Sequence, residues 1–217
     1  MASTLLPISA LNYAKEFIQH LPLDRAAISY RILDDAAKIM WVASTWRWSV
    51  GLLPLTAIVN DTDEITIGGG GVPADFLRVV WAGLVAAERT QDLTPVAIIP
   101  DAGEFKGQIR NITSTTTSSN VFRFYPIPTG YNPLPKLAVV YKKKHTEITS
   151  LNAGTAGTLV FDDEWFPVYQ AFVLYYAFLY AEDPRATGQF TTAMGLLDLM
   201  KTIEPPVLNL FGEPAKG

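Results

Sequence analysis

The sequence contains no cysteine and only two histidines, His20 and His145. The absence of cysteine excludes disulfides, thiolate metal sites and cysteine nucleophiles. The two histidines stand alone, and no Gly-x-Ser-x-Gly motif accompanies them, so neither zinc nor Ser-His-Asp chemistry is indicated. We therefore expect no catalytic residue, no cofactor and no metal, and we interpret each histidine as a surface or hydrogen-bonded side chain.

Charge is also scarce, because Asp, Glu, Lys and Arg make up 18% of the residues, against ~25% in typical proteins. The chain has 17 basic and 21 acidic residues and lacks the strongly basic surface of a tight nucleic-acid binder. Few charges leave more surface available for burial against other proteins. The composition thus favours an assembly subunit over an enzyme.

No apolar run reaches the ~20 residues that a membrane-spanning helix needs. The longest, Trp165 to Ala181, also contains Pro167 and Gln170, and we expect a buried or interface helix there rather than a membrane span. Aromatic rings would surround this helix on every face, so it must be covered on every face, in part by a neighbouring subunit. The predicted subunit-interface residues are Trp165, Phe166, Tyr169, Phe172 and Tyr176.

Helical periodicity appears at both ends of the chain. Apolar residues at steps of three and four predict helices from Ser9, as N-cap, to about Leu21, and from Leu23 to about Ser44. The same signal predicts a helix from Asp162 to about Asp183 and a last one from about Ala186 to Ile203. Asp162, Asp163 and Glu164 would favour the positive end of the third helix.

Strand patterns fill the middle of the chain. Trp46, Trp48 and Val50 alternate with polar residues, and Thr56–Val59 and Glu64–Ile67 flank a polar turn that indicates a hairpin. Turn-forming clusters separate the further predicted strands, which indicates antiparallel pairing: Leu77–Trp81, Val96–Ile99, Gly107–Thr113, Val121–Tyr125 and Leu137–Tyr141.

These elements predict an α+β fold in which N- and C-terminal helices form one bundle around an inserted antiparallel β-rich region. The expected boundaries are residues 1–45 and 161–206 for the bundle, 46–160 for the insertion and 207–217 for a C-terminal tail.

Three local features suggest chemistry but have simpler explanations. Gly68–Gly71 lacks the Gly-Lys-Ser/Thr of a phosphate-binding loop and is interpreted as a bent connector. Adjacent carboxylates such as Asp34 and Asp35 do not face each other on a helix and are interpreted as solvated or as partners of a helix dipole. Lys142, Lys143 and Lys144 are interpreted as a solvated sheet edge, or alternatively as a surface that faces an acidic partner or passing DNA.

Several short motifs resemble the head-to-tail adaptor, or connector, proteins of podovirus-type bacteriophages, a group that includes tubular gatekeeper tail proteins. The helix with Arg31-Ile32-Leu33 and Ala36-Ala37 leads into Trp46-Arg47-Trp48, and the resemblance covers about residues 23 to 202. The other motifs are Val72-Pro73-Ala74-Asp75-Phe76-Leu77, Tyr125-Pro126-Ile127-Pro128, Pro167-Val168-Tyr169 and Ala181-Glu182-Asp183-Pro184. Val72 departs from the leucine common there, and the Ser/Thr-rich stretch at 113–119 is a second departure.

The resemblance implies a structural virion protein of the neck or tail, assembled in the host cytoplasm, where a signal-free N-terminus would also keep it. It implies a homo-oligomeric ring of twelve copies that binds the portal protein and the tail nozzle or tube protein. Double-stranded DNA would pass through the lumen during ejection. It also implies that the tail docks onto the portal, with Val207, Leu208, Leu210 and Phe211 as the docking residues.

Two other interpretations remain open. The chain could be a different virion structural protein, such as a tail-completion or minor capsid protein. More distantly, it could be a β-rich carbohydrate-binding module that stacks sugars on Trp46, Trp48 and Trp81, although strand alternation favours burial of these rings.

Overall fold

The computed structural model describes the chain in several stretches and divides it into two compact units. Unit 1 combines Met1–Ser49 with His145–Pro206, and unit 2 contains Val50–Lys144. Residues 145–160, which we had assigned to the β-rich insertion, thus lie with the helices. The described residues are 4–18, 26–62, 64–66, 73–85, 93–95, 97–98, 106–107, 111–114, 121–125, 127–130 and 132–204.

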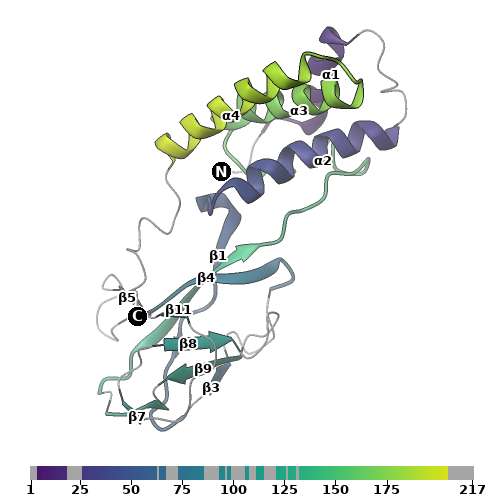
Figure 1. The fold of residues 1–217 in the computed structure, drawn as a ribbon. Helices are drawn as coiled ribbons and strands as arrows, with labels where there is room; N and C mark the ends of the chain where they lie inside the picture. The colour runs from purple at the N-terminus through teal and green to yellow at the C-terminus, as the bar shows by residue number, and fades with distance from the viewer. Residues whose placement is uncertain are drawn as a thin grey trace. The chain divides into compact units, whose positions relative to one another are not determined.

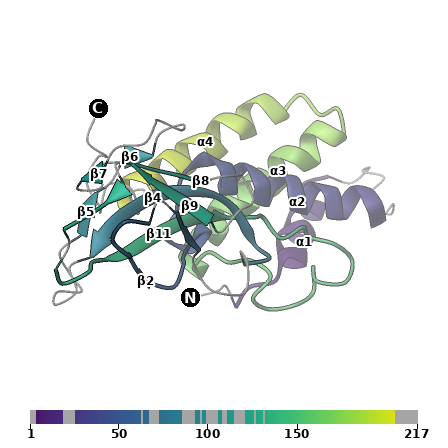
Figure 2. The ribbon, with the colours of Figure 1, turned by 90° about the horizontal axis from the view of Figure 1, so that it is seen from below.

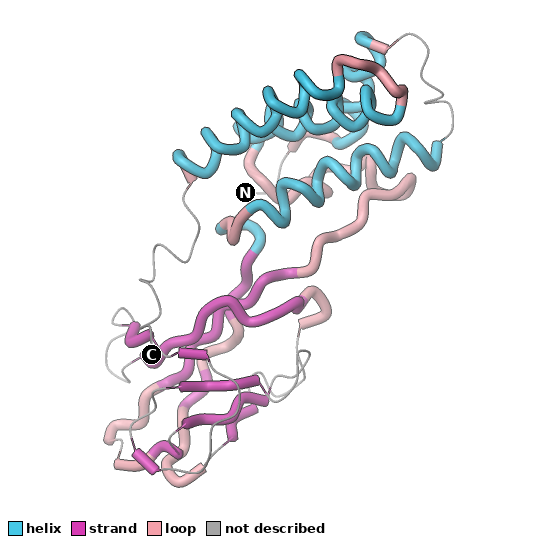
Figure 3. Tube along the Cα trace, viewed as in Figure 1, coloured by secondary structure: helices cyan, strands magenta, loops and turns pink. Residues whose placement is uncertain are grey.

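Helices make up unit 1 and strands make up unit 2, as the colours of Figure 3 show. This arrangement confirms the predicted α+β class, with helices from both ends of the chain in one unit. The helices are α1 (Pro7–Phe17), α2 (Ala26–Ala43), α3 (Phe166–Tyr180) and α4 (Ala186–Ile203).

Helix α3 is the centre of unit 1 and packs against each of the other three helices. It lies between α2 and α4 (Figure 2). Nine of its residues are buried, which satisfies the prediction that so apolar a helix must be covered nearly all round. The phenol of Tyr169, fully buried, donates a hydrogen bond to the carbonyl of Leu33 in α2 at 3.1 Å.

Two helix starts and one strand differ from the sequence prediction. Helix α1 begins at Pro7, not after Ser9, because proline needs no amide partner at the first position. A 3-10 turn at Asp163–Trp165 precedes α3. The expected strand at Trp46–Val50 is instead a 3-10 turn at Arg47–Ser49, in which the Ser49 amide and hydroxyl both donate to the Trp46 carbonyl, each at 2.9 Å.

The main sheet of unit 2 has the order β1-β11-β4-β5, four strands that Figure 1 labels. Strand β2 also pairs with β11. All of its pairs are antiparallel, as expected. The second sheet has the order β3-β9-β8-β6, and β10 pairs with β7. The strands of the main sheet are β1 (Val50–Leu52), β2 (Thr56–Ala57), β4 (Phe76–Val85), β5 (Leu93–Pro95) and β11 (Lys136–Lys143). The others are β3 (Glu64–Thr66), β6 (Ala97–Ile98), β7 (Lys106–Gly107), β8 (Asn111–Ser114), β9 (Val121–Tyr125) and β10 (Ile127–Pro128).

The predicted hairpin between Thr56–Val59 and Glu64–Ile67 is wrong. Strand β2 pairs with β11 and strand β3 pairs with β9, in different sheets. The alternating pattern correctly indicated strands, but it could not indicate their partners. Ile58, which follows β2, and Ile65 of β3 are buried in one core between other strands. Two short pairs, β6 with β8 and β7 with β10, are parallel rather than antiparallel.

A close approach at Gly51 gives the first testable consequence. A Cβ at this position would lie 2.5 Å from Cζ of Tyr141, its cross-strand partner. The ring cannot retreat easily, since it stacks on Phe76 at 5.2 Å and its hydroxyl donates to Asp75 at 3.1 Å. We expect Gly51→Ala to lower the free energy of unfolding of unit 2 by about 1–3 kcal/mol in denaturant titrations.

The matched control is Gly195→Ala in α4, where a Cβ would meet nothing within 4 Å. Because alanine favours helix over glycine by ~1 kcal/mol, this change should be neutral or stabilising. Equal losses in both variants would contradict the steric argument.

Candidate assembly site

The aromatic residues predicted for a subunit interface lie mostly inside unit 1. Trp165, Phe166, Tyr169 and Phe172 are buried by the chain's own helices, and only Tyr176 remains half-buried. Ring contacts link several of them, for example Phe166 with Tyr169 at 5.9 Å between centroids. Their interface role stays a prediction, and in this structure they form the bundle core.

Unit 1 leaves other apolar side chains exposed, and three of them lie on α4. Leu199 and Ile203 of α4 are more than half exposed, and Phe190 is exposed at the edge of the same helix. No charged residue occurs from Ala186 to Leu197, which is unusual for a helix with a solvent-facing side. This uncharged stretch was the signal in the sequence, and the residue-by-residue prediction missed it.

The outer face of α4 is also less polar than its threonines suggest. The hydroxyls of Thr191, Thr192 and Thr202 each donate to the carbonyl four residues earlier, at 3.2, 3.2 and 3.0 Å. A hydroxyl bonded inside its own helix leaves the methyl group facing outward. Burying this face against another protein would therefore break few hydrogen bonds to water.

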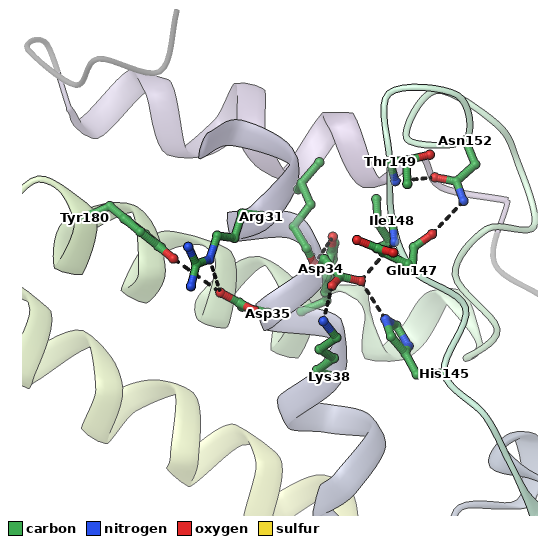
Figure 4. A network of polar contacts seen from close by, with 12 residues as sticks. Arg31, Asp34, Asp35, Lys38, His145, Glu147, Ile148, Thr149, Asn152 and Tyr180 are labelled. Carbon is green, nitrogen blue, oxygen red and sulfur yellow. Dashed lines mark hydrogen bonds and ion pairs between the residues drawn. The ribbon is translucent and has the colours of Figure 1, made fainter. Parts of the chain in front are cut away.

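A buried carboxylate on α2 holds the segment that follows the β-rich region (Figure 4). Asp34 is only 4% exposed and accepts hydrogen bonds from the amide of Ile148 at 2.9 Å and from Nε2 of His145 at 2.8 Å. Nζ of Lys38, one turn along α2, lies 2.5 Å from its other oxygen. The interpretation of Asp34 as solvated is thus wrong, whereas His145 is the hydrogen-bonded histidine that we expected.

These contacts also set the protonation of Asp34. Burial alone would raise the pKa of this carboxyl, but the hydrogen bonds from Lys38, Ile148 and His145 outweigh burial and hold the pKa below its ordinary value. Asp34 therefore stays ionised near neutral pH and keeps three donors. The sequence contains one signal for the burial of Asp34. It lies in a helical row with Tyr30, Ala37 and Trp41, where an apolar residue is normal.

The turn that follows is braced by its own side chains. Asn152 accepts from the amide of Thr149 at 2.8 Å and donates to the carbonyl of Glu147 at 2.9 Å (Figure 4). The amide of Ile8 in α1 donates to the carbonyl of Ala153 at 3.1 Å. The segment from His145 to Ala153 is therefore fixed to both α1 and α2.

The three lysines predicted as a solvated edge lie at the end of a central strand, and the edge interpretation is wrong. Strand β11 has β1 on one side and β4 on the other, and Lys142 pairs with Val50 and with Arg78. Lys142 is only 5% exposed, Lys143 is half-buried and Lys144 is exposed. A role for Lys142, Lys143 and Lys144 toward a partner or DNA stays a prediction.

The tryptophans do not form an open stacking platform. Trp46 and Trp81 are buried, and Nε1 of Trp46 donates to the Met40 carbonyl at 2.6 Å. Half-buried Trp48 packs between Trp46 and Trp41, with centroids 5.9 and 5.4 Å away. These contacts give no support to a sugar-binding role for the three rings.

Several predicted features fall outside the described residues, namely His20, Gly68–Gly71 and the docking residues Val207, Leu208, Leu210 and Phe211. Among the residues that are described, no group of three His, Asp or Glu side chains is placed to hold a metal ion. No helix in the described stretches has the length and apolar character to cross a membrane.

Comparison with known protein families identifies the family of this chain. The model of the SU10 adaptor protein family matches residues 15–207, which is most of the chain and includes α2, α3, α4 and the whole β-rich region. The chain belongs to the SU10 adaptor protein family. No match is found among curated proteins.

Membership makes this SU10 adaptor a structural component of a bacteriophage virion that associates with other virion components. Its task is therefore to present surfaces to other proteins. The outer face of α4 is one such surface in the described part of the chain.

Proposed function

We propose that this SU10 adaptor forms a ring that joins the portal to the tail nozzle or tube of a podovirus-type phage, in the manner of gatekeeper tail proteins. DNA passes through the lumen during ejection, and the ring contains twelve copies. The family match supports the adaptor role. The observation that supports assembly is the exposed apolar side chains of α4, where Leu199 is 53% and Ile203 is 60% exposed.

In this proposal α4 contacts a neighbouring copy, whereas α3 supports it from within. The tail docks onto the portal through Val207, Leu208, Leu210 and Phe211. A net charge of −4 suits a lumen that must let DNA slide, since a strongly basic lumen would grip the phosphates.

Mass measurement of the purified chain, alone and mixed with the portal protein of the same phage, tests the proposal. We expect assemblies of the chain that bind portal in a fixed ratio. A stable monomer that ignores the portal would contradict it. Truncation after Pro206 should weaken portal binding, and unchanged binding would remove the docking role of the tail.

The surface of α4 can be tested by a single charge. Leu199→Glu places a carboxylate on the exposed face of α4, next to the ion pair of Asp198 and Lys201. We expect the assembled fraction to fall at least about tenfold, because a charge buried in an interface is costly. Folding should be unaffected, since the side chain is more than half exposed. Analytical ultracentrifugation and circular dichroism measure the two effects.

The matched control is Val42→Glu, which adds the same charge at an apolar residue of α2 that is 75% exposed. We expect this variant to assemble as the unmodified chain does. Equal loss of assembly in both variants would show that α4 has no special role.

A further inference from the structure

Two cations are placed side by side at one end of the main sheet. Lys142 of β11 lies directly opposite Arg78 of β4 in the strand register. Arg78 is exposed, whereas Lys142 is almost completely buried. Burial, together with the charge of Arg78, lowers the pKa of Lys142 to about 8. This register places two positive charges together at this end of the sheet.

A third cation extends this basic cluster. Lys144 is exposed and follows β11 at the same end, where its amide donates to the Asp75 carbonyl. We call Arg78, Lys142 and Lys144 the basic cluster.

Unit 1 carries the opposite arrangement where the C-terminal end of α4 meets the segment before α3. Asp162 and Glu204 line a shallow hollow with Arg47 and Trp48. Burial raises the pKa of Glu204, and the nearby carboxylates of Asp162 and Glu164 raise it further, although Trp165 and Arg47 act in the opposite direction. We call Asp162, Glu164 and Glu204 the acidic cluster, which has three carboxylates around one guanidinium.

Each cluster borders exposed apolar side chains. Leu199 and Ile203 of α4 lie within two turns of Glu204. At the basic cluster, exposed Leu52 of β1 lies two residues after Val50, the residue opposite Lys142, and so on the same face of the sheet. A charged group with an adjoining apolar area is the usual composition of a protein interface, in which charges set the register and apolar contact supplies affinity.

We propose that the acidic cluster of one copy binds the basic cluster of a second copy of this chain. The inference rests on the proposed ring and specifies which surfaces meet within it. The two clusters carry opposite charges, and each adjoins apolar side chains that the second copy would cover. Because the two surfaces differ, the contact is head-to-tail, and repeated contacts of this kind close into a ring when the rotation allows.

Charge reversal tests the pairing. One variant carries Arg78→Glu with Lys144→Glu, and the other carries Asp162→Lys with Glu164→Lys. Lys142 and Glu204 are left unchanged, because Lys142 is buried in the sheet and Glu204 ends α4. We expect each variant alone to assemble roughly tenfold or more weakly, since like charges would face each other across the contact.

An equal mixture of the two variants should regain assembly when they alternate, because every contact then joins opposite charges, either two unmodified clusters or two reversed ones. A single chain with all four changes should also regain assembly. Restoration by the four-fold variant but not by the mixture would place the coupling inside one chain and overturn the proposal. Restoration by the mixture also shows that both variants fold.

Matched controls reverse exposed charges elsewhere. Lys136→Glu lies at the other end of β11, and Glu16→Lys lies on α1. Both should assemble normally. Assembly of the unmodified chain should weaken as salt rises from about 0.05 to 0.5 M, because exposed charges are screened.

The outcomes separate this inference from the proposed function. If the unmodified chain forms rings that bind portal and both reversed variants do the same, the pairing of clusters is wrong and the adaptor role stands. If the unmodified chain never assembles, with or without portal, the proposed function fails first.

Discussion

Asp34→Ala should lower the free energy of unfolding of unit 1 by about 3 kcal/mol, because it removes the acceptor of three hydrogen bonds at once. The amide of Ile148 would be left buried without its partner, and His145 would lose its contact with α2. Urea titration followed by circular dichroism at 222 nm measures the change. The helical signal of unit 1 reports it most directly.

The neighbouring carboxylate supplies a matched control. Asp35 lies on the same helix, but it is partly exposed and contacts Arg31 at 3.7 Å and the Tyr180 hydroxyl at 3.4 Å (Figure 4). Asp35→Ala should cost less than ~1 kcal/mol, as exposed ion pairs do. Similar losses for both variants would mean that the hydrogen bonds to Asp34 do not hold the His145–Ala153 segment.

The contribution of Asp34 to the free energy of unfolding should also decrease in acid. Because the pKa of Asp34 is lower in the folded than in the unfolded chain, its ionisation stabilises the fold above the unfolded value near 3.8. This stability is lost as the pH falls from about 4 through the folded pKa. Asp34→Asn keeps an acceptor for Ile148 but cannot titrate, so its unfolding free energy should fall less steeply below pH 4 than that of the unmodified chain. Parallel curves would contradict this assignment.

The helices could be predicted from the sequence because their information is local. The row Phe190, Ala193, Leu197 and Met200 repeats at steps of three and four, and α4 has the predicted bounds of Ala186 and Ile203. For α3, the observed end at Tyr180 precedes the predicted one, since the Ala181 amide donates to the carbonyls of Ala177 and Phe178 and closes the last turn.

Strand partners could not be predicted, because they depend on residues far apart in the chain. Strand β9 was identified at Val121–Tyr125 with its observed bounds, yet nothing in that pattern indicated that β3 and β8 would be its neighbours. The same limit applies to Lys142. Three consecutive lysines in a sequence indicate a solvated segment. Only the pairing of β11 with β1 and β4 shows that Lys142 is buried.

The candidate site shows the opposite pattern. Sequence reasoning selected the most aromatic helix as the interface, on the argument that a single chain could not cover it. The structure shows that α1, α2 and α4 cover most of α3. The inner faces of these helices pack on α3, and the outer face of α4 stays exposed. The exposed apolar side chains Phe190, Leu199 and Ile203 lie one helix further along, on α4.

Phe172 of α3 lies in the core of unit 1, whereas Phe190 of α4 lies at its surface. Phe172 of α3 is fully buried, so Phe172→Ala should lower the free energy of unfolding of unit 1 by about 3–5 kcal/mol through the lost transfer energy and the cavity. Phe190 of α4 is 38% exposed and contacts Tyr175 at 5.0 Å between ring centroids. Phe190→Ala should cost no more than about 1.5 kcal/mol.

The two variants should reverse their order when assembly is measured. Under conditions where both are folded, Phe190→Ala removes apolar area from the helix that faces a neighbouring copy in the proposed ring, whereas Phe172→Ala leaves that surface chemically unchanged. Sedimentation at matched folded concentration should therefore show the larger defect for Phe190→Ala. A larger assembly defect for Phe172→Ala would return the interface to α3, because a core residue would then be affecting association beyond its effect on folding.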